Sequence, residues 1–242
     1  DKVLIKFEDN TNDLVDFIIG ADGIFSNTRN FFEKKKNKKK FKKAIAVRAV
    51  LKSKPQLNID ENKISLMMGK NCHLVFYPIN KNKELNLVCI IRDNKYNPEN
   101  VKSSINKVLK QNINLRKVLD GNLSSWPLYS TPKILSSTNE KVFYIGDAFN
   151  GFLPTLAQGA AQSIESAFEL FNHLEGGTPN AQKIYFQERE KKAKIIRKRS
   201  NFNFFAFHLS SKILQMLRNF FMKFLIKRKS FLRSYLGEVY KN

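Results

Sequence analysis

The stretch from Val142 to Glu165 constrains the fold more than any other part of the 242-residue chain. It begins with a short apolar run, which predicts a buried strand, and that run ends at Gly146-Asp147. A loop containing Pro154 follows, and small and apolar residues then recur at helical spacing. A strand that leads through a Gly-Asp corner to an unobstructed helix amino terminus favours an α/β fold. Such a corner suits a ligand with hydroxyl groups and partial negative charge.

A second corner of this kind lies near the beginning of the chain. Alternating apolar and charged residues predict a strand over 3–8, and the apolar run 14–19 predicts its hairpin partner. Two glycines and Asp22 follow directly, and Ser26 is a suitable N-cap for the next helix. Strand ends that open onto helix amino termini are where α/β sheets bind anionic ligands.

The middle of the chain has a different pattern. Four strand-like segments joined by short polar connections predict an antiparallel sheet: 44–52, 63–68, 73–79 and 84–92. Beyond them the pattern predicts a strand over 123–129 and helices over 98–111, 157–174, 179–199 and 201–239. These changes in pattern predict domain boundaries after residues 43, 130 and 200. The predicted parts of the chain are therefore 1–43, 44–130, 131–200 and 201–242.

Composition narrows the choice of partner. The chain has 43 Lys and Arg residues against 21 Asp and Glu residues, which gives a net charge of +22. Such a charge is typical of proteins that bind nucleic acid, an acidic membrane or an anionic substrate. Much of the excess lies in the run 34–43, which lacks interleaved aromatic residues and is expected to be a solvated loop. Cys72 and Cys89 suggest neither a disulfide framework nor a metal site, so a reducing cytoplasm fits best. No apolar run approaches the length of a membrane span.

Two ordered motifs carry a resemblance to a known family. Residues 142–165 resemble the second flavin motif of the class A FAD-dependent aromatic monooxygenases, and Ala-Gln-Gly-Ala at 157–160 looks most like the salicylate hydroxylase branch. Residues 16–29 are similar to the Asp-Gly motif of the same enzymes. Weaker matches follow in the right order at 46–49, 73–78 and 126–129. No GxGxxG opens the chain, so the resemblance implies that the segment for the ADP part of FAD is absent from an N-terminally truncated sequence.

The resemblance implies an α/β (α+β) fold. In it an incomplete FAD-binding Rossmann-like domain is interrupted by an antiparallel substrate-binding sheet and closed by C-terminal helices. The resemblance also implies that Asp147 binds the ribityl chain of FAD and that the backbone of residues 154–160 lies against the isoalloxazine ring. Asp22 and Arg29 would serve the pyrophosphate and the pyridine nucleotide. The implied cofactor-binding residues are Asp22, Gly23, Arg29, Arg48, Gly146, Asp147, Pro154, Gly159 and Ala160.

The implied reaction is hydroxylation of a phenolic or heteroaromatic acid with NAD(P)H and O2. His73 is the candidate base, because an imidazole of pKa about 6.5 can take the proton of a phenol of pKa about 10. Tyr77, four residues along the same strand, would share its face and orient the substrate. The sequence departs from the family at Asn150, where His is usual, and at Ser166, where Asp is usual.

Two other functions stay open. One is a non-catalytic basic module that binds nucleic acid or anionic membrane, and the other is a flavoprotein hydroxylase of the same class that acts on a quinone precursor. The aromatic and basic segment 203–229 is expected to pack on the flavin domain, with an interfacial amphipathic helix as the alternative. We expect a small-molecule aromatic substrate and no specific nucleic acid, with a homodimer as an open question.

Overall fold

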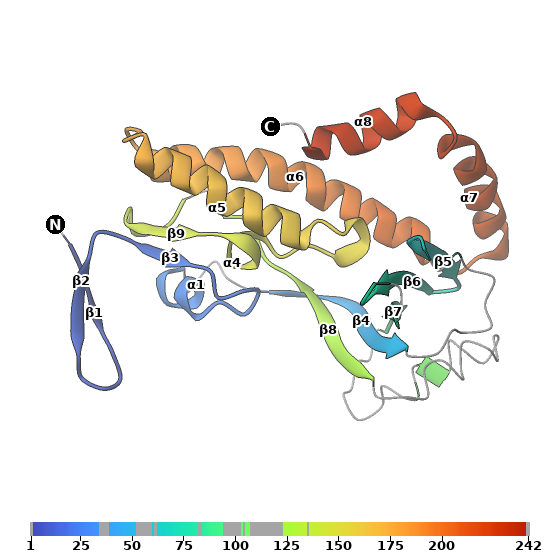
Figure 1. Ribbon diagram of the computed structural model, residues 1–242, viewed down its shortest axis with the longest axis horizontal. Coiled ribbons are helices and arrows are strands. Elements are labelled where there is room, and N and C mark those ends of the chain that lie inside the picture. The colour runs from blue at the N-terminus through green and yellow to red at the C-terminus, as the bar shows by residue number, and fades with distance from the viewer. Residues whose placement is uncertain are drawn as a thin grey trace. The chain divides into compact units, whose positions relative to one another are not determined.

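A computed structural model describes residues 2–33, 39–51, 60, 62–81, 84–93, 103, 105–106, 123–134 and 136–240 (Figure 1). Its packing divides the chain into two compact units. The first consists of Asp1–Lys40, Tyr129–Asn201 and Gly237–Asn242, and the second of Phe41–Leu128 and Phe202–Leu236. Each unit is therefore built from segments that lie far apart in the sequence.

Two small sheets form the first unit. Strands β1 (Val3–Lys6) and β2 (Asn12–Val15) make an antiparallel hairpin, whereas β3 (Ile18–Gly20) pairs in parallel with β9 (Val142–Tyr144). The sequence predicted one strand over 14–19. The structure divides that run at Asp16 and Phe17, because its two halves pair with different partners.

The helices of the first unit cover the parallel pair. They comprise α1 (Asn27–Phe32), α4 (Gly146–Asn150), the 3-10 turn η2 (Pro154–Leu156), α5 (Gly159–Glu175) and α6 (Ala181–Phe207) up to Asn201. Large side chains from β9, α4, α5 and α6 make one core, in which Tyr144, Phe149, Leu170, Tyr185 and Phe186 are buried. Figure 1 shows α5 and α6 along one side of β3 and β9.

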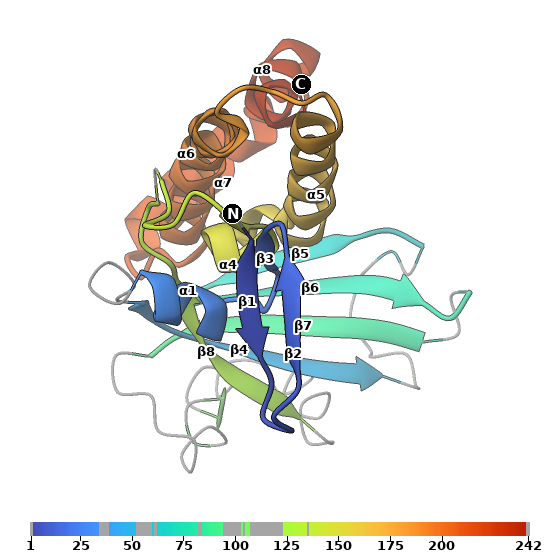
Figure 2. The ribbon, with the colours of Figure 1, turned by 90° about the vertical axis from the view of Figure 1, so that its left-hand side faces the viewer.

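The second unit contains one five-stranded sheet. Its order is β5-β6-β7-β4-β8, as Figure 2 shows, and the β5–β6, β6–β7 and β7–β4 pairs are antiparallel. The strands are β4 (Lys40–Leu51), β5 (Ser65–Gly69), β6 (Cys72–Ile79), β7 (Glu84–Arg92) and β8 (Ser124–Ser130). The predicted antiparallel sheet is confirmed. The helix predicted over 98–111 lies outside the described residues, apart from 103, 105 and 106.

The sheet has two chemically different faces, because side chains alternate along each strand. Val47, Leu74, Phe76, Leu87 and Cys89 belong to a buried core on one face. Cys72 lies in the same core, and both thiols are free. The opposite face holds a mixture of apolar and polar side chains from β4, β6 and β7.

The end of the chain is helical, as predicted. After α6 come α7 (Lys212–Leu225) and α8 (Lys229–Tyr240). Among the described residues, no helix is both long and apolar enough to cross a membrane. The mixed α/β fold with an antiparallel sheet and C-terminal helices is thus the one that the sequence predicted.

Candidate functional site

Two aspartates follow the ends of paired parallel strands in the first unit. The register joins Gly20 of β3 to Tyr144 of β9, and the amide of Ile145 continues the pairing by donating to the carbonyl of Gly20 (3.0 Å). Asp22 lies two residues beyond Gly20, and Asp147 lies three residues beyond Tyr144. The carboxyl ends of both strands therefore bring the two predicted corners to one edge of the sheet.

Glycine is required at both corners. A Cβ at Gly20 would lie 2.9 Å from the Tyr144 ring, so the two strands could not approach as they do. Gly146 has φ +56, and a Cβ there would lie 2.8 Å from Ser163 Oγ. These contacts explain why a glycine ends β3 and why another begins α4, shortly after β9.

Ser26 is the N-cap of α1, as predicted, and Asp22 holds this cap in place. Its carboxylate accepts hydrogen bonds from Ser26 Oγ (2.5 Å), from the amide of Thr28 (2.9 Å) and from Thr28 Oγ1 (3.1 Å). Burial by itself raises the pKa of Asp22, but the hydrogen bonds from Ser26 and Thr28 outweigh it and hold the pKa below its usual value. Gly23 next to it has φ +77, which explains why a glycine follows the aspartate. The cofactor contacts predicted for Asp22 and Gly23 stay predictions.

Arg29 is buried inside the first unit, with 1% of its surface exposed. Its guanidinium donates to the carbonyls of Ala148 (2.9 Å), Phe149 (2.6 Å) and Pro132 (2.6 Å). These contacts tie α1 to α4 and to the segment before β9. A direct contact between Arg29 and a cofactor, as predicted from the sequence, has no support in this geometry, because the guanidinium donates to protein carbonyls.

Asp147 differs from Asp22. Its half-buried carboxylate makes no hydrogen bond to any residue that the structure describes, and burial raises its pKa above the usual 3.8. A carboxylate that is partly removed from water and has no partner in the protein is a suitable acceptor for the hydroxyl groups of a ligand.

The loop after Asp147 leads to the amino terminus of α5. Pro154 begins η2, Ala157 adopts a left-handed conformation (φ 54), and its amide donates to the carbonyl of Pro154 (3.1 Å). The helix then starts at Gly159 and Ala160, both exposed, and the N-cap side chain makes no capping hydrogen bond. The first amides of a 17-residue helix therefore face away from protein acceptors, where they favour negative charge.

The two departures from the family pattern have partners in the first unit. The amide of Gly146 donates to Ser166 Oγ (3.0 Å), so the serine still fastens the corner to α5. Arg197 donates to Asn150 Oδ1 (2.7 Å) and to both carboxylate oxygens of Glu190 (3.2 Å each). Asn150 therefore connects α4 to α6.

A second polar group lies in the second unit, on the sheet face opposite the core. Arg48 of β4 is exposed, and its Nε donates to Asn86 Oδ1 of β7 (2.6 Å). Asn86 itself is fully buried, and its Nδ2 has no hydrogen-bond partner. Tyr77 stands opposite Asn86 in the register and is half-buried. Arg48, predicted as a cofactor ligand, thus shares a face with Tyr77, predicted as a catalytic residue.

His73 lies on the same face but is only 2% exposed. Its Nδ1 is 3.2 Å from Nε2 of His208, whose own Nδ1 is 2.6 Å from the carbonyl of Phe204. Burial, together with the charge of His208, lowers the pKa of His73 to about 3. The catalytic role of His73 stays a prediction, but this environment supports a structural role, since a base must reach its substrate.

A family model described as squalene epoxidase matches residues 15–234 of the chain. The chain belongs to the squalene epoxidase family. It is thus of the flavin-dependent monooxygenase class that the two sequence motifs predicted.

The characterised proteins that resemble this member of the squalene epoxidase family share little sequence identity with it. A 3-amino-4-hydroxybenzoate 2-monooxygenase of Streptomyces platensis is 23% identical over 231 residues, which cover 90% of this chain and 58% of that protein. The chain therefore spans less than two thirds of the length of that relative. Among solved structures, Klebsiella pneumoniae HpxO complexed with FAD and uric acid has a TM-score of 0.75 at 13% identity, covering 99% of this chain and 63% of its own. A salicylate hydroxylase substrate complex has a TM-score of 0.71 at 17% identity, with coverages of 100% and 68%.

Two residues of these sites were missed by sequence reasoning. Asn86 has a local signal, since it is the one amide in the apolar run from Leu85 to Ile91. His208 has none, because 135 residues separate it from His73. Only the tertiary structure of this chain brings His73 and His208 together.

Proposed function

We propose that the chain is the flavin- and substrate-binding part of an FAD-dependent monooxygenase that hydroxylates an aromatic acid. The observation that supports this most directly is the half-buried carboxylate of Asp147, which has no described partner and precedes the uncapped amino terminus of α5. Membership of the squalene epoxidase family makes a flavin the expected occupant of such a corner.

The residues of the first unit fit the flavin half of FAD. Asp147 would accept hydrogen bonds from the ribityl hydroxyls, and the backbone from Pro154 to Ala160 would lie against the ring. The free amides of α5 would stabilise negative charge on the reduced ring. When bound, the flavin would take electrons from NAD(P)H and transfer one atom of O2 to the substrate. The balanced reaction converts ArH, O2, NAD(P)H and H⁺ to ArOH, NAD(P)⁺ and H2O.

Other predicted cofactor residues of the first unit act indirectly in this proposal. Asp22 and Arg29 use their polar atoms on the protein itself, and they hold α1 and α4 at the strand ends. Gly23 and Gly146 supply backbone conformations that other residues rarely adopt. These residues shape the corner, while Asp147, Gly159 and Ala160 would contact the cofactor.

The substrate face belongs to the second unit. The guanidinium of Arg48 makes its one hydrogen bond among the described residues through Nε, which leaves two nitrogens for a carboxylate. The buried Nδ2 of Asn86 needs an acceptor, and an unpaired donor is costly to bury. Val75 and Val88, half-buried on the same face, provide apolar contact for a ring. We therefore assign Arg48 to the substrate and not to the cofactor.

An acidic substrate also suits the charge of the protein, since a net charge of +22 attracts anions. Tyr77 would orient the phenol or the carboxylate from β6, opposite Asn86. The alternative substrate for the same hydroxylation is a quinone precursor. Binding of such a substrate would not need the guanidinium of Arg48. Two free buried thiols are consistent with a cytoplasmic location.

Flavin retention tests the first half of the proposal. The intact protein would be purified, passed through gel filtration and assayed for bound FAD, alongside Asp147→Ala and the control Glu140→Ala. Glu140 is exposed and precedes the start of β9, whereas Asp147 follows the end of that strand, so the loss of Glu140 should not change FAD binding. We expect stoichiometric FAD in the parent and the control and at least tenfold weaker binding in Asp147→Ala. A folded parent that never binds FAD would overturn the proposal.

Substrate kinetics test the second half. A panel of phenolic acids, their neutral analogues and quinone precursors would be compared for NAD(P)H consumption and hydroxylated product. Loss of a charge-assisted hydrogen bond predicts that Arg48→Ala raises KM for acids about 10- to 100-fold and leaves neutral analogues nearly unaffected. Equal effects on acids and neutral analogues would remove Arg48 from the substrate face.

A further inference from the structure

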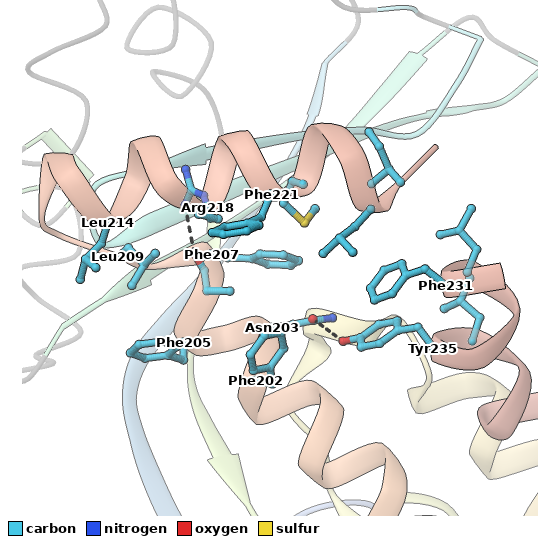
Figure 3. A pocket seen from close by; sticks show the side chains of 16 residues that line it. Phe202, Asn203, Phe205, Phe207, Leu209, Leu214, Arg218, Phe221, Phe231 and Tyr235 are labelled. Carbon is cyan, nitrogen blue, oxygen red and sulfur yellow. Dashed lines mark hydrogen bonds between the residues drawn. The ribbon is translucent and has the colours of Figure 1, made fainter. Parts of the chain in front are cut away.

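The last turns of α6 and the helices α7 and α8 surround an apolar cavity within the second unit. Its volume is about 550 Å³, a size typical of sites for small organic ligands. Figure 3 shows side chains from all three helices around this space. The aromatic residues that line it are Phe202, Phe205, Phe207, Phe221, Phe231 and Tyr235.

The side chains of the protein do not fill this cavity. Phe202, Phe205 and Phe221 line it and yet are 60%, 56% and 57% exposed. Aromatic side chains between packed helices normally lose most of their exposure, because burying their large apolar surface stabilises the fold. Water gains little in such a space, since apolar walls offer few hydrogen bonds. An apolar ligand would therefore remove exposed aromatic surface from water.

Several rings of the cavity wall are held in fixed orientations. Phe231 and Tyr235 stack with their ring centroids 5.5 Å apart and their planes at 17°. The hydroxyl of Tyr235 donates to Asn203 Oδ1 (2.6 Å). Phe207 packs edge-on against His73, with ring centroids 5.2 Å apart. Fixed rings favour a flat aromatic ligand, which can pack face or edge against them, over an aliphatic chain, which loses more conformational freedom on binding.

Arg218 of α7 places a cation at the cavity. Its side chain is half-buried, and the guanidinium donates to the carbonyl of Ala206 (3.0 Å) and to Asn219 Oδ1 (3.0 and 3.1 Å). These three hydrogen bonds leave two of the five N–H groups of an arginine without an acceptor in the described part of the chain. No described carboxylate pairs with it, and residues 201–242 contain eight Lys and Arg against one acidic residue, Glu238. A ligand with an anionic group would supply the missing partner.

We propose that the cavity binds a fused-ring aromatic molecule with one anionic group, whose rings lie among the aromatic side chains of the three helices and whose anion pairs with Arg218. The described residues that line the cavity all come from 202–236, so the site is separate from the sheet face of Arg48. Binding there involves no covalent or redox step. The inference does not depend on the proposed hydroxylation.

Fluorescence titration tests the role of the charge. The intact protein would be titrated with 1-anilinonaphthalene-8-sulfonate and with N-phenyl-1-naphthylamine, which has the same rings and no sulfonate. We expect one saturable site per chain for the sulfonate and about tenfold weaker binding of the neutral amine, because a charge-assisted hydrogen bond is lost. Arg218→Gln should weaken binding of the sulfonate about tenfold and leave binding of the amine unchanged, whereas Arg218→Lys should retain the preference for the anion.

Two neighbouring phenylalanines on α7 test the place of binding. Phe221 lines the cavity and Phe220 does not, although they are 57% and 58% exposed. Phe221→Ser should weaken binding of both probes about tenfold, because it removes a ring from the wall, whereas Phe220→Ser should bind like the parent. Arg48→Ala should also bind both probes like the parent, since it alters only the sheet face. Circular dichroism would show that each variant is folded.

Competition shows which class of ligand the cavity takes. Displacement of the sulfonate probe by 1-naphthoate should be more effective than displacement by decanoate, an aliphatic acid of the same charge. A folded parent without a saturable site, or equal losses in Phe220→Ser and Phe221→Ser, would show that the probes only adsorb to exposed apolar surface. The proposal is also wrong if Arg218→Gln affects both probes equally or if decanoate is the better competitor. Loss of the site in Arg48→Ala would place the ligand on the sheet face instead.

Discussion

Arg197 of α6 donates a 2.7 Å hydrogen bond to Asn150 at the end of α4, and the same guanidinium grips both oxygens of Glu190. Glu190 is only 6% exposed, so its charge depends on these partners, with Lys133 farther away at 3.9 Å. Asn150 stands where the family usually has His, and in this chain it connects α4 to α6.

Removing Arg197 is therefore expected to destabilise the protein. Arg197→Ala leaves a buried carboxylate with one distant cation, which predicts a loss of about 3 kcal/mol in the free energy of unfolding. Urea titration followed by circular dichroism would measure the loss. The matched control is Lys198→Ala on the same helix, which is exposed and should change stability by less than about 0.5 kcal/mol. Equal stability of the two variants would contradict the network.

The two glycines of the flavin corner should respond differently to alanine. Gly146→Ala is expected to lose about 1–2 kcal/mol from backbone conformation alone, and more from the contact of its Cβ with Ser163. Gly159→Ala has open space around its Cβ and lies in a helix, so it should be neutral or slightly stabilising. Thermal unfolding without flavin would compare them. A harmless Gly146→Ala would show that the corner is not as tight as described.

Asp147 is expected to lower the free energy of unfolding when no ligand is bound. Its folded pKa is raised by burial, so the charged form is disfavoured in the folded state and stability falls as pH rises through the carboxyl's titration. Asp147→Asn is thus expected to be more stable than the parent at pH 7 in the absence of FAD. The difference should vanish as pH falls below the ordinary value of 3.8. Melting temperatures of the parent and the variant would be compared across this pH range. A variant that is less stable than the parent at pH 7 would show that Asp147 has a stabilising partner.

His73 should influence acid stability. A folded pKa lowered from 6.5 to about 3 means that the stability held above pH 6.5 is lost progressively as pH falls toward 3. Replacement by phenylalanine keeps the ring contact with Phe207 and removes the titration. His73→Phe should therefore show a shallower decline in unfolding free energy over that interval, with His208 contributing the remainder. Parallel profiles for parent and variant would show that His73 is not held neutral by burial.

Local pattern was sufficient for much of the fold. The strand-like segments 73–79 and 84–92, joined by a short polar connection of hairpin length, predicted two strands of the antiparallel sheet, because strands, like turns, depend on neighbouring residues. The Gly-Asp corners were visible because a strand end, a glycine and a helix start are neighbours in sequence. The run 14–19 was misjudged, since its division at Asp16 depends on β9, more than 120 residues away.

The sequence by itself determined the class of the protein and the residues at the two corners, because these depend on short-range spacing and backbone conformation. Only the tertiary structure decided what those residues touch. It gave Arg29 three carbonyls inside the protein, left Asp147 without a described partner, and placed Arg48 beside Asn86. The physical reason is that hydrogen bonding and burial depend on neighbours from distant segments, and those neighbours meet only when the chain folds.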